Sequence, residues 1–304
     1  MEISGKSIVV TGGAGFIGSN LVERLAQSNK VTVVDNMHTG SKKNLDAAMA
    51  TGNVKLVKAD SKEIAKVAPP PDIIFHLGMY SSTPMYKKNP HLVNEVVDGA
   101  ISVLEFAKEK KAKVVIASTS SIYNGHATPY REELLPKVSD FYTEGRYAVE
   151  RLAELYGTLY GVDSICLRLF SVYGPHEEAK KQFANLVNQF MWSMRKGESP
   201  LIYGDGKQTR DFTYVDDTVE AFVRAVGAKG FDVFNVGTGK SHTMNELVEK
   251  LNRRMGTDIA PTYRPIDTSN YVLRTLADTT KAAKVLGFRA KTTLDEGIDK
   301  LLVL

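Results

Sequence analysis

The chain has 304 residues, a net charge of +4 and one cysteine, Cys166. Its lysine pairs are short and lack interleaved aromatic residues, and its histidines lack metal-ligand spacing, which argues against nucleic acid and metal as ligands. No signal peptide or apolar run of membrane length is recognised and Cys166 has no internal partner, so we expect a cytoplasmic protein without a membrane anchor.

The first predicted elements are a strand over Ile8–Val10, a glycine-rich turn and a helix that begins near Phe16. Gly12 lets the chain bend, Gly15 lets a pyrophosphate approach the backbone, and Gly18 lets the helix pack on the strand. The helix N-terminus offers free N–H groups and the positive end of its dipole. This turn therefore predicts a dinucleotide site.

A second strand, Val31–Val34, ends in Asp35, about twenty residues after the glycine turn. A carboxylate at this point can hold the adenosine ribose hydroxyls and would repel a 2′-phosphate, so the sequence favours NAD over NADP. The glycine spacing G-x-x-G-x-x-G resembles that of the short-chain dehydrogenase/reductase superfamily.

Further strands and helices alternate along the first half of the chain, which predicts an α/β fold with a doubly wound parallel (Rossmann) sheet. The remaining predicted strands are Val54–Ala59, Asp72–Gly78, Lys113–Ser118 and Asp163–Phe170, and the helices are Val93–Glu109, Arg146–Tyr160 and Phe183–Lys196. We expect an NAD-binding domain over 1–170. Residues 171–304 would form mainly a smaller α/β substrate-binding lobe, with some chain crossing back to the sheet.

Hydroxyl side chains follow the strand that ends at Ser118, in the run from Thr119 to Tyr123. One of them could hydrogen-bond a substrate oxygen, or the run could be a turn that satisfies its own backbone. Tyr142 and Arg146 come next, one helical turn apart. A neighbouring cation favours the ionised phenol that a general base requires. The alternative is a tyrosine packed on an arginine of a solvated helix.

Taken in order, these motifs resemble the extended short-chain dehydrogenases/reductases, specifically nucleotide-sugar epimerases of the UDP-galactose 4-epimerase type. The resemblance spans essentially the whole chain and rests on TGGAGFIGS (11–19), STSSIY (118–123), Tyr142-x-x-x-Arg146, LRLFSVYGP (167–175) and YGDGKQTRDFTYVDD (203–217). It implies an isomerase that uses NAD to epimerise C4 of a UDP-hexose through a 4-keto sugar. It also implies a homodimer joined through the two long helices.

The resemblance also assigns roles to individual residues. Tyr142 would be the base that takes the O4 proton, Thr119 would hydrogen-bond O4, and Arg146 stands where the family has a catalytic lysine. Cofactor contacts are implied for Gly12, Gly15, Phe16, Ile17, Gly18, Asp35, Asn36, Asp60, Ser61, Leu77, Gly78, Tyr142 and Arg146. Substrate contacts are implied for Thr119, Ser171, Asn185, Leu186, Tyr203, Arg210, Arg274 and Thr275.

Departures from the family pattern leave alternatives open. Because arginine presents its donors differently from lysine, Arg146 allows either an active epimerase or a non-catalytic NAD-binding sensor. Thr275 is small enough for a UDP-N-acetylhexosamine, and LRLFSVYGP is similar to the UDP-glucuronate 4-epimerases. A dehydrogenase that releases NADH also remains open. Ser120 and Ser121 occupy the positions where dehydratases and decarboxylases of the family carry acids, which disfavours those reactions.

Overall fold

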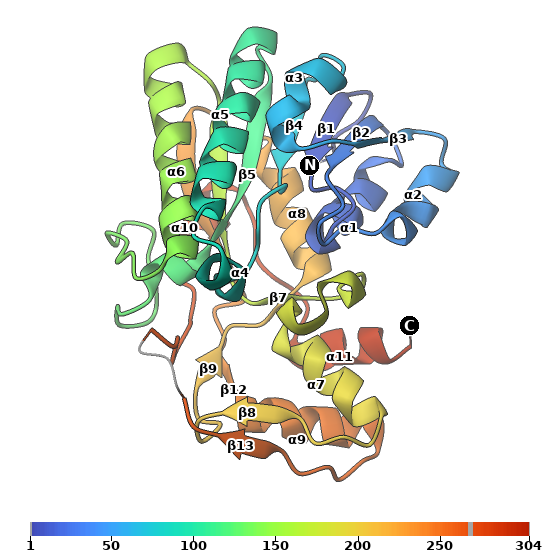
Figure 1. The fold of residues 1–304 in the computed structure, drawn as a ribbon, viewed down its shortest axis with the longest axis vertical. Coiled ribbons are helices and arrows are strands. Elements are labelled where there is room, and N and C mark those ends of the chain that lie inside the picture. Colours follow the sequence, from blue (N-terminus) through green and yellow to red (C-terminus); the bar gives the residue numbers. More distant parts are fainter. Residues whose placement is uncertain (1, 267–269, 304) are drawn as a thin grey trace.

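The computed structural model describes residues 2–266 and 270–303. A seven-stranded sheet forms its centre, with all strands parallel and in the order β11-β6-β5-β4-β1-β2-β3 (Figure 1). The bounds are β1 (Ser7–Thr11), β2 (Lys30–Asp35), β3 (Val54–Lys58), β4 (Ile73–His76), β5 (Lys113–Thr119), β6 (Ser164–Leu169) and β11 (Phe231–Val236). The predicted doubly wound parallel sheet is confirmed.

Alternating side chains of the strands bury both faces of the sheet, as in other parallel sheets. Val10 faces a core shared with α1 (Phe16–Leu25) and α8 (Val215–Ala225), whereas its neighbour Val9 faces α5 (Leu92–Lys110) and α6 (Phe141–Tyr160). The other helices are α2 (Asp46–Ala50), α3 (Ile64–Val67), α4 (Thr83–Lys88), α7 (Leu186–Arg195), α9 (Met244–Met255), α10 (Thr280–Val285) and α11 (Leu294–Leu302), with 3₁₀ turns η1 (Lys42–Leu45), η2 (Ser61–Glu63), η3 (Ser120–Tyr123) and η4 (Glu178–Phe183).

Capping residues shift two helix starts away from the predicted ones. The Asp140 side chain accepts a hydrogen bond from the Thr143 amide at 2.7 Å, so α6 begins at Phe141 and includes Tyr142 in its first turn. The Asn185 side chain accepts from the Val187 amide at 3.0 Å, so α7 begins later than predicted, at Leu186.

The C-terminal part of the chain combines α7, α9 and α11 with short strand pairs (Figure 1). These pairs are β7 (Val172–Tyr173) with β10 (Thr213–Tyr214), β8 (Leu201–Tyr203) with β13 (Thr262–Arg264) and β9 (Thr209–Arg210) with β12 (His242–Thr243). After α8 the chain returns to the sheet as β11. The functional division at residue 170 stays a prediction. Across the described ranges we find no helix whose length and apolarity would carry it through a bilayer, and the cytoplasmic location stays a prediction.

A buried ion pair ties α6 to the sheet. The Arg168 Nη2 of β6 donates to the Glu150 carboxylate at 2.7 Å, and the two side chains are 5% and 3% exposed. Arg168 Nη1 also donates to the Tyr123 hydroxyl at 2.6 Å. Because Glu150 lies one turn after Arg146, this pair holds the helix face that carries Arg146 and Tyr142 against the sheet.

We predict that Glu150→Ala lowers the free energy of unfolding by about 3–5 kcal/mol, because it leaves the Arg168 guanidinium buried without its carboxylate. Urea unfolding followed by circular dichroism measures this loss. The control is Glu154→Ala, which removes an exposed partner of Arg151 on the same helix and should change stability by less than about 1 kcal/mol. Equal losses in the two variants would contradict the role of the buried pair.

Candidate active site

A cavity of about 380 Å³ runs along the carboxyl ends of the sheet strands, where open α/β sheets bind ligands. Its walls come from the segments that follow the strands: 12–18 after β1, 35–40 after β2, 59–61 after β3, 77–81 after β4 and 117–121 at the end of β5. The C-terminal part closes it with residues of η4, with Arg210 and with Thr275.

The glycine turn needs its small residues. Gly12 has φ +68°, and a Cβ there would lie 2.7 Å from the Gly78 amide nitrogen. A Cβ at Gly18 would lie 2.1 Å from the Gly12 carbonyl oxygen, so α1 packs directly on the turn. No side chain of the described part caps the first turn of α1. The amides of Phe16, Ile17 and Gly18, in the first turn of α1, therefore remain available to a phosphate.

The carboxylate of Asp35 lies at the end of β2 and accepts hydrogen bonds from the amides of Met37 at 2.7 Å and Ala14 at 2.9 Å. Burial raises the pKa of Asp35, and these amide bonds oppose that rise. The bond to Ala14 means that Asp35 supports the glycine turn as well as lining the cavity. Next to it, the Asn36 side chain donates to Asp60 at 3.1 Å, so the two predicted adenosine contacts are linked.

Tyr142 and Arg146 meet on the cavity wall, as their spacing predicts. The Arg146 Cζ lies 5.4 Å from the centre of the Tyr142 ring, and Tyr86 packs edge-on against the same ring at 5.5 Å. Tyr142 is 8% exposed, and no hydrogen bond joins its hydroxyl to another residue of the described ranges. The hydroxyl is therefore available to a ligand. The solvated-helix alternative does not describe this buried pair.

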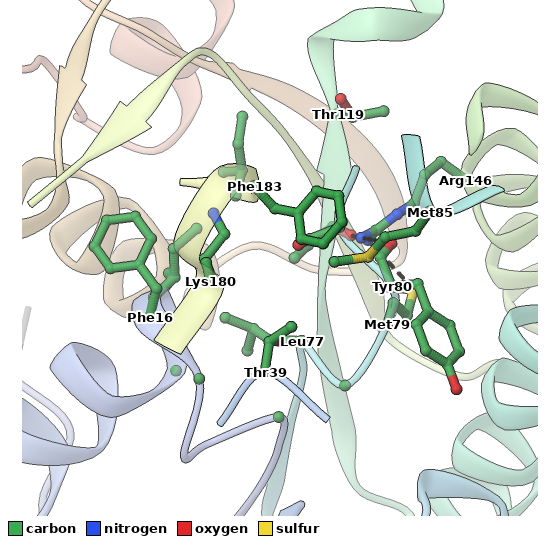
Figure 2. Close-up of a pocket in the computed structure, with 18 of the residues that line it drawn as sticks. Phe16, Thr39, Leu77, Met79, Tyr80, Met85, Thr119, Arg146, Lys180 and Phe183 are labelled. Carbon is green, nitrogen blue, oxygen red and sulfur yellow. Dashed lines mark hydrogen bonds between the residues drawn. The ribbon is translucent and has the colours of Figure 1, made fainter. Parts of the chain in front are cut away.

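Two backbone carbonyls hold the Arg146 guanidinium. Nη1 donates to the Ala117 carbonyl of β5 at 2.8 Å, and Nη2 donates to the Tyr80 carbonyl after β4 at 2.9 Å (Figure 2). Nε is buried and has no partner among the described residues. A planar fork suits this arrangement, because its separate nitrogens reach β5 and the segment after β4 at once.

The hydroxyl run after β5 forms a turn that satisfies its own backbone, and it also lines the cavity. The Thr119 hydroxyl accepts a hydrogen bond from the Ser121 amide at 3.1 Å, as in a self-satisfied turn. Thr119 nevertheless lines the cavity (Figure 2), so its own hydrogen can still reach a ligand. His76, at the end of β4, is fully buried beside Thr11, and burial and then Arg146 lower its pKa to about 3. It therefore stays neutral.

All predicted cofactor residues line this cavity, and the site fits NAD. The uncapped first turn of α1 suits the pyrophosphate, and the unpartnered Nε of Arg146 can donate to a ribose hydroxyl. Of the predicted substrate residues, the lining includes Thr119, Ser171, Asn185, Arg210 and Thr275.

The structure places the other predicted substrate residues outside the cavity lining. Leu186 packs against the core at the start of α7. Tyr203 is 41% exposed at the end of β8, and Arg274 is exposed on the surface. Their ligand contacts, like those of the residues that do line the cavity, stay predictions.

Several residues of the lining belong to no motif of the sequence and were not predicted. Met79, Tyr80 and Met85 surround Arg146, and Lys180 and Phe183 project from η4 (Figure 2). A Glu177-x-x-Lys180 spacing was the available signal in η4, but the segment has neither strand nor helix periodicity. The aromatic and methionine residues after β4 carry no motif.

The chain is similar to several known proteins. The model of the "NAD dependent epimerase/dehydratase family" matches residues 8–237. The UDP-glucose 4-epimerase of Mycolicibacterium smegmatis is 34% identical over 304 residues, which covers 96% of each chain. UDP-glucuronic acid decarboxylase 2 of Arabidopsis thaliana is 32% identical, over 98% of this chain and 68% of the relative. The solved UDP-N-acetylglucosamine 4-epimerase from Methanobrevibacter ruminantium M1 superimposes with a TM-score of 0.92 at 29% identity, over 99% of both chains.

The chain belongs to the NAD-dependent epimerase/dehydratase family, and the predicted resemblance is confirmed. This family consists of enzymes whose cofactor is NAD, so the predicted cofactor is confirmed as well.

Proposed function

We propose that the protein interconverts UDP-galactose and UDP-glucose by epimerisation at C4. The observation that carries this proposal is the set of side chains at the β5 end of the cavity. Two hydroxyl groups line that end, and no carboxylate of the described residues lies beside them. Thr119 and Tyr142 line that end, while the carboxylates that line the described cavity are Asp35 and Asp60 after β2 and β3, and Glu95 on α5. A site with a base but no adjacent acid suits oxidation and return at one carbon better than elimination of water.

When bound, NAD would supply the acceptor for the C4 hydride and the donor that returns it, and the glycine turn, Asp35 and Arg146 would hold the cofactor. Tyr142, as the phenolate, takes the O4 proton while Thr119 hydrogen-bonds the same oxygen. Arg146 supplies a fixed positive charge beside the phenolate. The inversion is complete once the 4-keto sugar has rotated, its C4 has regained the hydride on the opposite face and Tyr142 has returned the proton to O4.

The 4-keto sugar can rotate within the site without being released only if its nucleotide stays bound. Arg210 supports this role, because it lines the cavity and forms no ion pair with a carboxylate of the described residues. It donates to the Thr209 carbonyl at 2.8 Å, and burial lowers its pKa. A partly buried cation without an anionic partner is unfavourable, and the diphosphate of a UDP-sugar would supply that anion. Asn185 lines the same wall.

A UDP-N-acetylhexosamine 4-epimerase is the second candidate. Thr275 supports it, because this small side chain is 5% exposed and accepts a hydrogen bond from the Asp211 amide at 3.1 Å. This hydrogen bond fixes the Thr275 hydroxyl, and the small side chain lines the cavity where the N-acetyl group of such a substrate would lie. A UDP-glucuronate 4-epimerase and an NAD-binding sensor remain as further alternatives.

The test is to incubate the purified protein with UDP-galactose, UDP-glucose, their N-acetyl forms and UDP-glucuronate, and to follow sugar configuration by NMR. We expect galactose–glucose interconversion without net NADH. A UDP-pentose formed from UDP-glucuronate would show that the protein is a decarboxylase and would overturn the proposal. Binding of NAD without conversion of any of these sugars would favour the non-catalytic NAD-binding sensor over the proposed epimerase.

We also propose a homodimer that pairs α5 and α6 of two copies. Apolar residues on these two mutually packed helices are exposed: Ile101 by 36%, Leu155 by 46% and Leu159 by 64%. Light scattering after size-exclusion chromatography should give twice the chain mass of 33.4 kDa. A Leu159→Lys variant that remains dimeric would place the interface elsewhere.

A further inference from the structure

A lysine that the proposed mechanism does not use lines the same cavity. Lys180 lies on η4, between β7 and α7, and its Nζ lies 5.3 Å from the centre of the Phe16 ring. Phe16 is the first residue of α1, whose uncapped amides face the cavity. Figure 2 shows the Lys180 side chain between Phe16 and Phe183. An ammonium group thus stands beside the helix end that already favours an anion.

A buried carboxylate holds Lys180 in this position. The Lys180 Nζ donates to the Glu177 Oε1 at 2.7 Å, and Glu177 is fully buried. Both Glu177 oxygens also accept from the Asn185 amide, at 3.0 and 3.1 Å. Burial raises the pKa of Glu177, and Lys180 and then the Asn185 amide oppose that rise. Since Glu177 is fixed by the backbone of the next helix, it orients Lys180 before any ligand arrives.

The ammonium keeps bonding capacity for a ligand. Glu177 is its hydrogen-bond partner among the described residues, which leaves further N–H donors of the ammonium free. The next residue, Lys181, has φ +50° and is exposed. A non-glycine residue in this backbone region is strained. The segment thus turns so that one lysine lines the cavity while its neighbour points to solvent.

We propose that Lys180 binds a diphosphate oxygen from the η4 side of the cavity, and that Glu177 positions it. A diphosphate matches the position, because a flexible ammonium and the α1 amides can share one anionic group. Two ligands carry this group: the NAD pyrophosphate and the diphosphate of the nucleotide sugar. The inference rests on the proposed function only for the second ligand.

The experiment compares Lys180→Met with Lys181→Met, which removes the same charge from the exposed neighbour. Protein freed of nucleotide is titrated separately with NAD and with UDP by calorimetry, at low and high salt. Loss of a charge-assisted hydrogen bond should weaken one ligand about ten- to hundred-fold in Lys180→Met and lessen its salt dependence. Lys181→Met should keep its affinities for NAD and UDP within about twofold of those of the parent protein. Lys180→Arg should recover part of the affinity that Lys180→Met loses, because the charge remains.

Weaker NAD binding alone would assign Lys180 to the dinucleotide, and weaker UDP binding alone would assign it to the nucleotide sugar. If Lys180→Met and Lys181→Met bind both ligands equally, the proposal is overturned. A protein that binds NAD but not UDP would refute the proposed substrate class, while its NAD titration would still decide the role of Lys180. If Lys180→Met does not fold by circular dichroism, Glu177→Gln provides the same comparison, because it removes the charge that orients Lys180.

Discussion

A Tyr142→Phe variant is expected to bind NAD like the parent protein and to lose about 10²–10⁴-fold in turnover of UDP-galactose, the range associated with removal of a general base. The phenol ring would keep its contacts with Tyr86 and Arg146, and its hydroxyl has no partner within the described ranges. The change therefore removes the proton acceptor with little effect on packing. Turnover is measured by NMR of the sugar configuration, and NAD binding by calorimetry.

Tyr147→Phe is the matched control for this variant. Tyr147 lies on the same helix, half-buried against a separate cluster, and does not line the cavity. It should keep the activity of the parent. If Tyr142→Phe keeps more than about a tenth of the parent rate, another group takes the O4 proton and the mechanism proposed above is wrong.

Arg146→Met should have the second large effect, a loss of about 100-fold or more in turnover together with weaker NAD binding. The variant removes the cation beside Tyr142 and leaves the carbonyls of Ala117 and Tyr80 without their donor. It also removes the buried Nε that can donate to a ribose hydroxyl. The readouts are turnover, NAD affinity and the urea midpoint.

Arg146→Lys separates charge from geometry. Lysine keeps the cation, but its compact ammonium does not reproduce the planar fork that spans two carbonyls. Turnover between the values of the parent and the Met variant would mean that the fork positions the site. Turnover equal to that of the parent would mean that the charge alone matters. Parent-like turnover in Arg146→Met would contradict a catalytic role. The control is Arg151→Met, which removes a cation from an exposed position of the same helix, α6.

The sheet could be predicted because its signals are local. Apolar runs such as Ile8–Val10 and 31–34 bury both strand faces, and the glycine turn between them leaves few other conformations. The cofactor side of the site follows from that prediction, since the ends of parallel strands meet at one edge. The position of Asp35 was therefore predictable, while its bond to the Ala14 amide depends on how the turn folds back.

The remaining features depend on contacts between distant segments. The early start of α6 depends on one aspartate, Asp140, whose cap outweighs the hydrophobic pattern of the helix. The segment that carries Lys180 has no periodicity, and its inward direction depends on a buried glutamate and on the amide of Asn185. Similarly, Tyr203 belongs to a motif but lies on a strand whose pairing with β13 leaves it exposed.

The chain passes more than once between the sheet and its C-terminal part, and these connecting passages are bonded to one another. The chain leaves the sheet after β6, returns through β10 into α8, and leaves again after β11. Pairing of β7 with β10 joins the first two passages. The buried Asp211 accepts from the amides of Thr238 at 2.8 Å and Gly239 at 3.0 Å, which joins the second to the third. A clamshell opening would have to break these bonds, so the two links oppose separation of the C-terminal part from the sheet as a rigid body.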